Sequence, residues 1–126
     1  MAKSYVEFEV SKELKDKTLE ALRLVRQSQT GKIRKGVNEV TKSLERGLSK
    51  FVVIAEDVDP EEVVKHIPML CKQKNVPFTY VSSKQELGKA IGLNVNCSVV
   101  SLEDYGSAES NIKDVISKVP VKQEGK

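Results

Sequence analysis

The sequence predicts an α/β fold, a three-layer α-β-α sandwich around a mixed, mostly four-stranded sheet. Short apolar runs typical of buried strands alternate along the chain with longer segments of helical periodicity. Because helices between strands favour parallel pairing, most of the sheet is expected to be parallel. With 126 residues and a mass of 14.0 kDa, the chain is expected to form a single domain over residues 1–126.

The first half of the chain predicts two helices with a short strand between them. Ser11 is a suitable N-cap for a helix that runs to about residue 29. A strand over residues 32–35, which are mostly charged, would make the sheet mixed. On a helical wheel, residues 37–48 have an apolar side that can pack and a polar side that can bind. The apolar side carries Val37, Val40, Thr41, Leu44 and Leu48, and the polar side carries Asn38, Glu39, Lys42 and Arg46.

Three further strands are predicted from apolar runs. Residues 51–55 (FVVIA) show the continuous apolar pattern of a strand that is covered on both faces. Similar runs predict strands over residues 78–81 and 97–102.

Helix signals separate these strands. Asp59 as N-cap, Pro60 at the first helical position and glutamates in the first turn predict a helix from residue 60 to about residue 74, bent at Pro68. A short helix is expected to begin after Ser83 and to end at Gly92. A last helix over residues 107–118, ended by Pro120, and a frayed tail from about residue 121 complete the prediction.

The net charge of this chain is small, but positive and negative residues are concentrated in different segments. The formal net charge is only +3, yet residues 31–50 carry six Lys or Arg against two Glu, whereas residues 56–62 carry five carboxylates. Local charge of this kind attracts a polyanion to one face. A protein that merely coated a nucleic acid would be more uniformly basic, so selective recognition is predicted.

The segment around Gly36 has features of a nucleic-acid-binding site. A glycine just before a helix leaves the first free backbone N–H groups and the positive end of the dipole to meet a phosphate. Glu39 is unusual here, because an ionised carboxylate only accepts hydrogen bonds. Guanine offers matched N1–H and N2–H donors in RNA bulges, loops and non-standard pairs. The pattern alone leaves open an amphipathic surface helix with solvated charges.

Patterns for catalysis are incomplete in this chain. Gly31 and Gly36 have the glycine spacing of a phosphate-binding P-loop, but Val37 and Asn38 stand where Lys and Ser or Thr are needed. His66 has no nucleophile partner that the sequence identifies, and it is expected to be a structural or surface histidine. We therefore expect no enzymatic activity and no cofactor.

The cysteines have no metal-binding pattern, and the first residues have no export signal. Cys71 and Cys97 lack metal-ligand spacing, so both are expected to be reduced core thiols. The first residues lack an apolar signal core, and no run approaches the roughly 18 apolar residues of a membrane span. A cytoplasmic protein without a membrane partner is expected.

Several further motifs favour RNA binding over a solvated surface helix. The segment GVNEVTK at residues 36–42 is followed by IAEDVDP at residues 54–60, and further along come LC, NVP, a lysine, LG and GL, at residues 70–71, 75–77, 84, 87–88 and 92–93. Together they resemble the archaeal large-subunit ribosomal proteins that bind kink-turns and also serve as core proteins of box C/D and box H/ACA guide RNAs. The resemblance extends from about Tyr5 to the last helix and implies the same fold.

This resemblance implies roles for individual residues. Asn38 and Glu39 would read the guanine edges that tandem sheared G·A pairs expose in a kink-turn. Neighbouring basic side chains and Gly36 would hold phosphates. A pocket for an extruded nucleotide and an apolar loop beside it would complete the site. The predicted RNA-binding residues are Lys32, Arg34, Lys35, Gly36, Asn38, Glu39, Lys42, Arg46, Asp59, Val63, Lys84, Leu93, Asn94 and Val95.

Some of these residues have a second interpretation. Asp59 is a good N-cap regardless of RNA, and Val63 taken alone would be a core residue. Asn94 stands where archaeal members often have an acid. The loop over residues 93–95 would lie on the wrong edge of an all-parallel sheet, so its participation rests on the resemblance.

The predicted function is a non-catalytic RNA-binding protein that stabilises kink-turns and nucleates ribonucleoprotein assembly. The resemblance implies a monomer whose partners are ribosomal RNA, box C/D and H/ACA guide RNAs, ribonuclease P RNA in tRNA processing, and other guide-particle proteins. The alternative is a ribosomal structural protein that packs on rRNA by shape and charge only. A small-molecule-binding α/β protein is a third hypothesis.

Overall fold

The structure of this chain is a computed structural model that describes residues 5–119. The strands are β1 (Lys32–Lys35), β2 (Phe51–Ala55), β3 (Phe78–Val81) and β4 (Val99–Asp104). The helices are α1 (Lys12–Gln27), α2 (Val37–Glu45), α3 (His66–Gln73), α4 (Lys84–Ala90) and α5 (Glu109–Ser117), with short 3₁₀ turns at Glu61–Val63 and Gly106–Ala108. The predicted end of the last helix at Pro120 and the tail from residue 121 lie outside the described residues.

The four strands form one mixed sheet in the order β1-β4-β2-β3. Only β2 and β3 pair in parallel, whereas β4 is antiparallel to both β1 and β2. The predicted mixed sheet is confirmed, but the expectation of a largely parallel sheet is wrong. A parallel crossover must carry the chain to the opposite edge of the sheet. Here the Cys97 N–H donates to the Lys84 carbonyl at 3.0 Å, so the chain is back at the start of α4 just before β4 begins.

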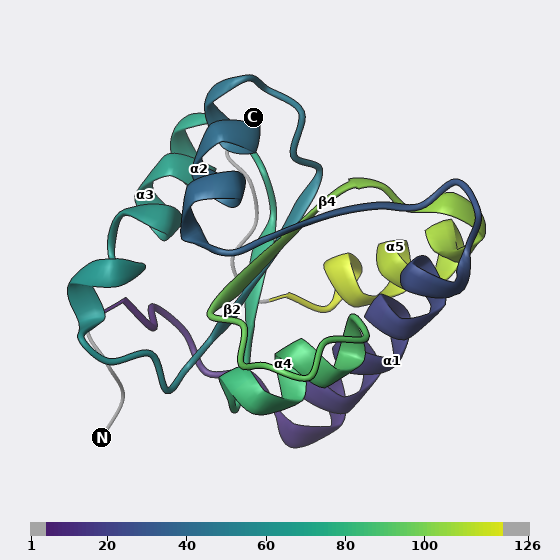
Figure 1. Cartoon of the computed structure of the whole chain (residues 1–126), viewed down its shortest axis with the longest axis horizontal. Coiled ribbons are helices and arrows are strands. Elements are labelled where there is room, and N and C mark those ends of the chain that lie inside the picture. The colour runs from purple at the N-terminus through teal and green to yellow at the C-terminus, as the bar shows by residue number, and fades with distance from the viewer. Residues whose placement is uncertain (1–4, 120–126) are drawn as a thin grey trace.

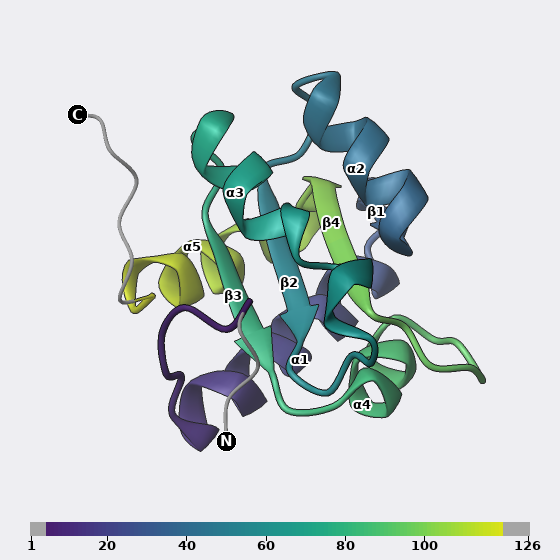
Figure 2. The ribbon, with the colours of Figure 1, turned by 90° about the vertical axis from the view of Figure 1, so that its left-hand side faces the viewer.

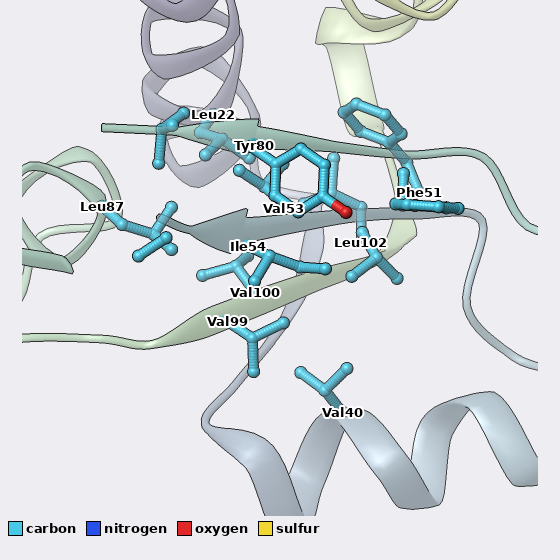
Figure 3. Close-up of a cluster of buried hydrophobic side chains, with 14 of the residues drawn as sticks. Leu22, Val40, Phe51, Val53, Ile54, Tyr80, Leu87, Val99, Val100 and Leu102 are labelled. Carbon is cyan, nitrogen blue, oxygen red and sulfur yellow. The ribbon is translucent and has the colours of Figure 1, made fainter. Parts of the chain in front are cut away.

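Helices cover both faces of the sheet, as the sandwich prediction requires. Helices α2 and α3 lie on one face, and α1, α4 and α5 lie on the other (Figure 1). All five residues of β2 are buried. Figure 3 shows Val40 of α2 pointing toward the strand of Val99, while Leu22 of α1 and Leu87 of α4 belong to the same buried cluster.

Local capping agrees with the sequence at two helices. The Leu14 N–H donates to Ser11 Oγ at 3.1 Å, and the Glu86 N–H donates to Ser83 Oγ at 3.1 Å. Helix α2 ends at Glu45, earlier than the predicted residue 48, because the chain reverses through Gly47 with φ of +74°. The last strand begins at residue 99 rather than 97.

The predicted continuous helix over residues 60–74 is wrong. Pro60 has extended backbone with ψ of 155°, so Asp59 is not the N-cap of a helix that starts there. A 3₁₀ turn follows, and α3 begins only at His66. Pro68 therefore lies in the first turn of α3, where its missing N–H would have no partner, and it does not bend a longer helix.

Two tyrosine hydroxyls attach the N-terminal segment to the sheet. The Tyr5 hydroxyl donates to the Ala55 carbonyl at 2.7 Å and accepts from the Val58 N–H at 3.0 Å. The Tyr80 hydroxyl donates to the Tyr5 carbonyl at 2.5 Å. Burial raises the pKa of Tyr5, so this hydroxyl stays protonated at neutral pH. The loop that leaves β2 is thereby held at its first turn.

Replacing Tyr5 by Phe is expected to lower the free energy of unfolding by about 1–3 kcal/mol, because a buried N–H and a buried carbonyl lose their partner. Urea denaturation measures the loss. Tyr105→Phe is the matched control, since that hydroxyl makes one exposed bond to the Lys50 carbonyl at 3.1 Å and should cost under about 1 kcal/mol. Equal losses in the two variants would contradict the role of Tyr5.

Candidate functional site

The reversed direction of β4 brings most of the predicted site residues to one edge of the sheet. Strands β2 and β3 end at this edge, and β4 begins there (Figure 2). Because β1 is antiparallel to β4, β1 ends at the same edge. We call it the loop edge, and it consists of residues 35–39, 56–63, 82–84 and 92–98. The loop over residues 93–95 therefore lies on the same edge as the other segments.

Hydrogen bonds join the segments of the loop edge to one another. The Glu56 N–H donates to the Val81 carbonyl at 2.9 Å. The Lys84 N–H donates to Asp57 Oδ1 at 2.8 Å, and the Lys84 carbonyl accepts from Cys97. The backbone at the start of α4 is therefore held from two sides, by the loop after β2 and by the loop before β4.

The first turn of α2 belongs to the same arrangement. Gly36 has φ of +88°, which favours glycine, and its N–H donates to the Val99 carbonyl at 2.9 Å. Gly36 is the N-cap and provides no side-chain hydrogen bond, so the first N–H groups of α2 are available to an anion.

Asn38 and Glu39 are exposed side chains in this first turn. Glu39 Oε1 lies 3.4 Å from the Lys35 backbone nitrogen, at the long end of hydrogen-bonding distance. A carboxylate at a helix N-terminus is also favoured by the helix dipole. The helix thus supplies a stabilising interaction for Glu39 that the sequence interpretation did not consider.

A basic face extends from the loop edge along β1 and α2. Its cations are Lys32, Arg34, Lys42 and Arg46. Arg34, Lys42 and Arg46 line a hollow of about 120 Å³, together with Glu39, Ser43, Leu48 and Glu103. Arg46 follows the last residue of α2, about 12 Å along the helix from Asn38. Lys32 lies opposite Asp104 in the β1–β4 register, at the far end of β1, so it lies away from the loop edge.

Three cations of this face form no ion pair within the described chain. Between residues 5 and 119, Lys32, Lys42 and Arg46 form no salt bridge, whereas lysines of α1 and α5 pair with carboxylates four residues away. The charges of Lys32, Lys42 and Arg46 are therefore available to an external anion, whereas Arg34 is already paired with Glu103.

The three residues assigned to the nucleotide pocket lie on the loop edge. Asp59 is exposed, and it does not cap a helix. Val63 is 40% exposed while the adjacent Val64 is fully buried, so Val63 is not a core residue. Lys84 is half-buried at the first position of α4.

The loop before β4 divides its apolar residues between core and surface. Leu93 packs against the hydrophobic core, whereas Val95 is 67% exposed and Asn94 is exposed beside it. Gly88 permits this arrangement, because a Cβ there would lie 2.2 Å from the Val95 carbonyl oxygen. The backbone of the loop and the backbone of α4 meet at this glycine.

Sequence reasoning missed the residues that support the site rather than form it. Tyr5 holds the loop after β2, Asp57 holds the start of α4, and Glu103 contacts Arg34 at 3.1 Å. Their partners are 27 to 69 positions away in the sequence, so no local pattern indicates the contacts.

His66, Cys71 and Cys97 are the other side chains that the sequence analysis considered for catalysis or metal binding. His66 lies at the start of α3, with Nε2 2.9 Å from Thr41 Oγ1. Both cysteines are buried and free, as predicted, and burial raises the pKa of Cys71 to about 12. Over residues 5–119, no group of three or more metal-ligating side chains is found. None of the helices in that range has the length and apolar character needed to cross a bilayer.

A protein family and a solved structure are similar to this chain. The family model described as "Ribosomal protein L7Ae/L30e/S12e/Gadd45 family" matches residues 16–112. Among solved structures, the Giardia lamblia 15.5kD RNA binding protein is similar, with a TM-score of 0.83 and 29% sequence identity. The alignment covers 93% of this chain and 96% of that one.

Gly88→Ala tests the close approach of α4 and the loop before β4. Alanine in place of glycine within a helix usually stabilises by about 0.5–1 kcal/mol. Here the added Cβ would displace backbone at Val95, so thermal unfolding should show a lower midpoint. Backbone NMR shifts should change over residues 93–97 in the same variant. A higher midpoint with unchanged shifts would contradict the contact.

Proposed function

This chain belongs to the ribosomal protein L7Ae/L30e/S12e/Gadd45 family, and we propose that it is a non-catalytic RNA-binding protein that recognises kink-turns. One observation carries the proposal: the loop edge joins the helix N-terminus of α2 to three further segments that the kink-turn resemblance had selected from distant parts of the sequence. Such an edge can contact a bent RNA at several points at once. The similar Giardia lamblia protein, which is named as RNA-binding, supports the coarser part of the proposal.

The proposed recognition divides between base edges and phosphates. At the guanine edges of tandem sheared G·A pairs, Glu39 would accept hydrogen bonds, and Asn38 would accept or donate them. Lys35, Gly36 and the basic face would hold phosphates, which fixes the register of the RNA without reading its sequence. The exposed Asn38 and Glu39 share α2 with Lys42, which forms no salt bridge within residues 5–119.

The extruded nucleotide of the kink-turn would lie against the other segments of the loop edge. Asp59 offers a charged acceptor, the exposed part of Val63 offers apolar contact, and Lys84 offers a cation. Val95 would add an exposed apolar surface beside them. Binding would select the bent RNA from a flexible ensemble and stabilise the form on which other proteins assemble.

The proposal extends to partners and location. Ribosomal RNA, box C/D and H/ACA guide RNAs and ribonuclease P RNA would each present a kink-turn to a monomeric, cytoplasmic protein. The archaeal assignment stays a prediction.

A gel-shift experiment with one kink-turn RNA and a variant whose G·A pairs are replaced by Watson–Crick pairs tests this function. The protein should bind the kink-turn much more tightly, because the replacement hides the guanine donors and relaxes the bend. Equal binding of the two RNAs would contradict kink-turn recognition and favour packing on rRNA by shape and charge only.

Glu39→Gln should weaken kink-turn binding by about 1–3 kcal/mol, because the amide has one acceptor oxygen where the carboxylate has two. Simple electrostatics predicts the opposite sign, since the change removes a negative charge from a surface that meets phosphates. Glu45→Gln removes the same charge from the exposed end of α2 and serves as the control. Unchanged or tighter binding by the Glu39 variant, with circular dichroism unaltered, would exclude a base-reading carboxylate.

Lys42→Ala should reduce the slope of log affinity against log salt concentration by about one unit, because one phosphate contact is lost. Fluorescence anisotropy at four or more salt concentrations measures the slope. The control is Lys113→Ala, which removes the same charge from α5 on the other face of the sheet. Identical slopes for wild type and the Lys42 variant would show that this lysine meets no phosphate.

A further inference from the structure

A chain of three buried serine hydroxyls runs between β4 and the basic face. Ser101 is fully buried in β4, Ser43 is 3% exposed in α2, and Ser49 is 7% exposed between α2 and β2. Ser101 Oγ donates to Ser49 Oγ at 2.6 Å, and Ser49 Oγ lies 2.7 Å from Ser43 Oγ. Ser43 Oγ donates to Glu103 Oε2 at 2.7 Å.

The direction of this chain follows from proton counting. Each hydroxyl has one proton, and an ionised carboxylate can only accept. Since Ser43 gives its proton to Glu103, Ser49 must donate to Ser43, and every hydroxyl then points toward the carboxylate. Hydrogen bonds aligned in one direction in a buried environment strengthen one another.

The same carboxylate oxygen holds Arg34. Arg34 Nε lies 3.1 Å from Glu103 Oε2, and the two side chains are 49% and 9% exposed. Burial alone would raise the pKa of Glu103, but the Ser43 hydroxyl and the Arg34 guanidinium outweigh it and lower that pKa. The ion pair joins Arg34 Nε to Glu103 Oε2, and half of the Arg34 side chain is exposed, so the guanidinium can still reach an external anion.

The largely buried Glu103 carboxylate lies beside the proposed phosphate-binding surface, although its negative charge repels anions. Helix α2 lies beside β1 and β4 (Figure 2), and the hollow between them is lined by Arg34, Lys42 and Arg46 above Glu103. A flexible arginine loses side-chain entropy when it meets a phosphate. An arginine that is already fixed at Nε loses less of it.

We propose that Glu103 is a positioning residue, which together with the serine chain fixes the Arg34 guanidinium so that its Nη groups meet a backbone phosphate of bound RNA. This inference rests on the proposed function, and it assigns a role to residues that contact no RNA themselves. The phosphate sits over the hollow, where Lys42 and Arg46 supply further positive charge.

A double-mutant cycle of Glu103→Gln and Arg34→Ala, measured by fluorescence anisotropy at fixed salt, tests the proposal. Glu103→Gln should weaken RNA binding about five- to tenfold despite making the face more positive, and it should have no effect in the Arg34→Ala background. Glu45→Gln is the charge-matched control and should leave affinity level or raise it. Independent losses in the cycle, or tighter binding by Glu103→Gln, would overturn the positioning role.

The RNA affinity of Ser43→Ala and the hydrogen exchange of Arg34 test the positioning role independently. Ser43→Ala retains both charges but removes one donor to Glu103, so it should give a smaller loss that also vanishes with Arg34→Ala. In the free protein, the Arg34 Nε–H should exchange slowly with water and exchange faster in Glu103→Gln, and equal exchange would overturn the proposal.

The cycle is run on the kink-turn RNA and on its Watson–Crick variant. Equal binding of the two RNAs by wild type contradicts kink-turn recognition. Even then, the double-mutant cycle still measures the coupling between Glu103 and Arg34, because both RNAs present phosphates. Failure of the positioning role and failure of the proposed function therefore give different results.

Discussion

The direction of β4 is the constraint on which the candidate site depends. Because β4 is antiparallel to both of its neighbours, the chain enters it at the edge where the other three strands end. The loop before β4 therefore meets the start of α4 and the N-terminus of α2, and the hydrogen bonds of Cys97 and Val99 close that arrangement. A parallel β4 would put residues 93–95 on the opposite edge and separate them from Gly36 and Lys84.

Much of the fold could be predicted from local patterns. The bounds of β1, β2 and β3, the caps at Ser11 and Ser83, and the family itself all follow from the sequence. The direction of β4 could not, because apolar runs show burial but not strand direction. The prediction of a helix over residues 60–74 failed because cap and proline signals are local, whereas Pro60 has extended backbone in the loop after β2.

The exposed residues of the candidate site could be predicted from the sequence, but the residues that support them could not. Exposed residues that carry unusual chemistry, such as Glu39 and Lys42, stand out in the sequence. The residues beneath them do not, because Asp57, Gly88 and Glu103 act through partners that only the fold brings near. Most buried polar groups are paired. Here the serine chain ends at the Glu103 carboxylate, which in turn pairs with Arg34 at the surface.

NMR titration of the protein with kink-turn RNA tests the central claim most directly, because backbone shifts report each segment of the loop edge separately. The account predicts that residues 35–39, 59–63, 84 and 93–95 shift together at one stoichiometry, while the exposed residues of α5 stay unchanged. Shifts confined to β1 and α2, with the loops after β2 and before β4 unaffected, would show that RNA meets only the basic face and would contradict a site built by the loop edge.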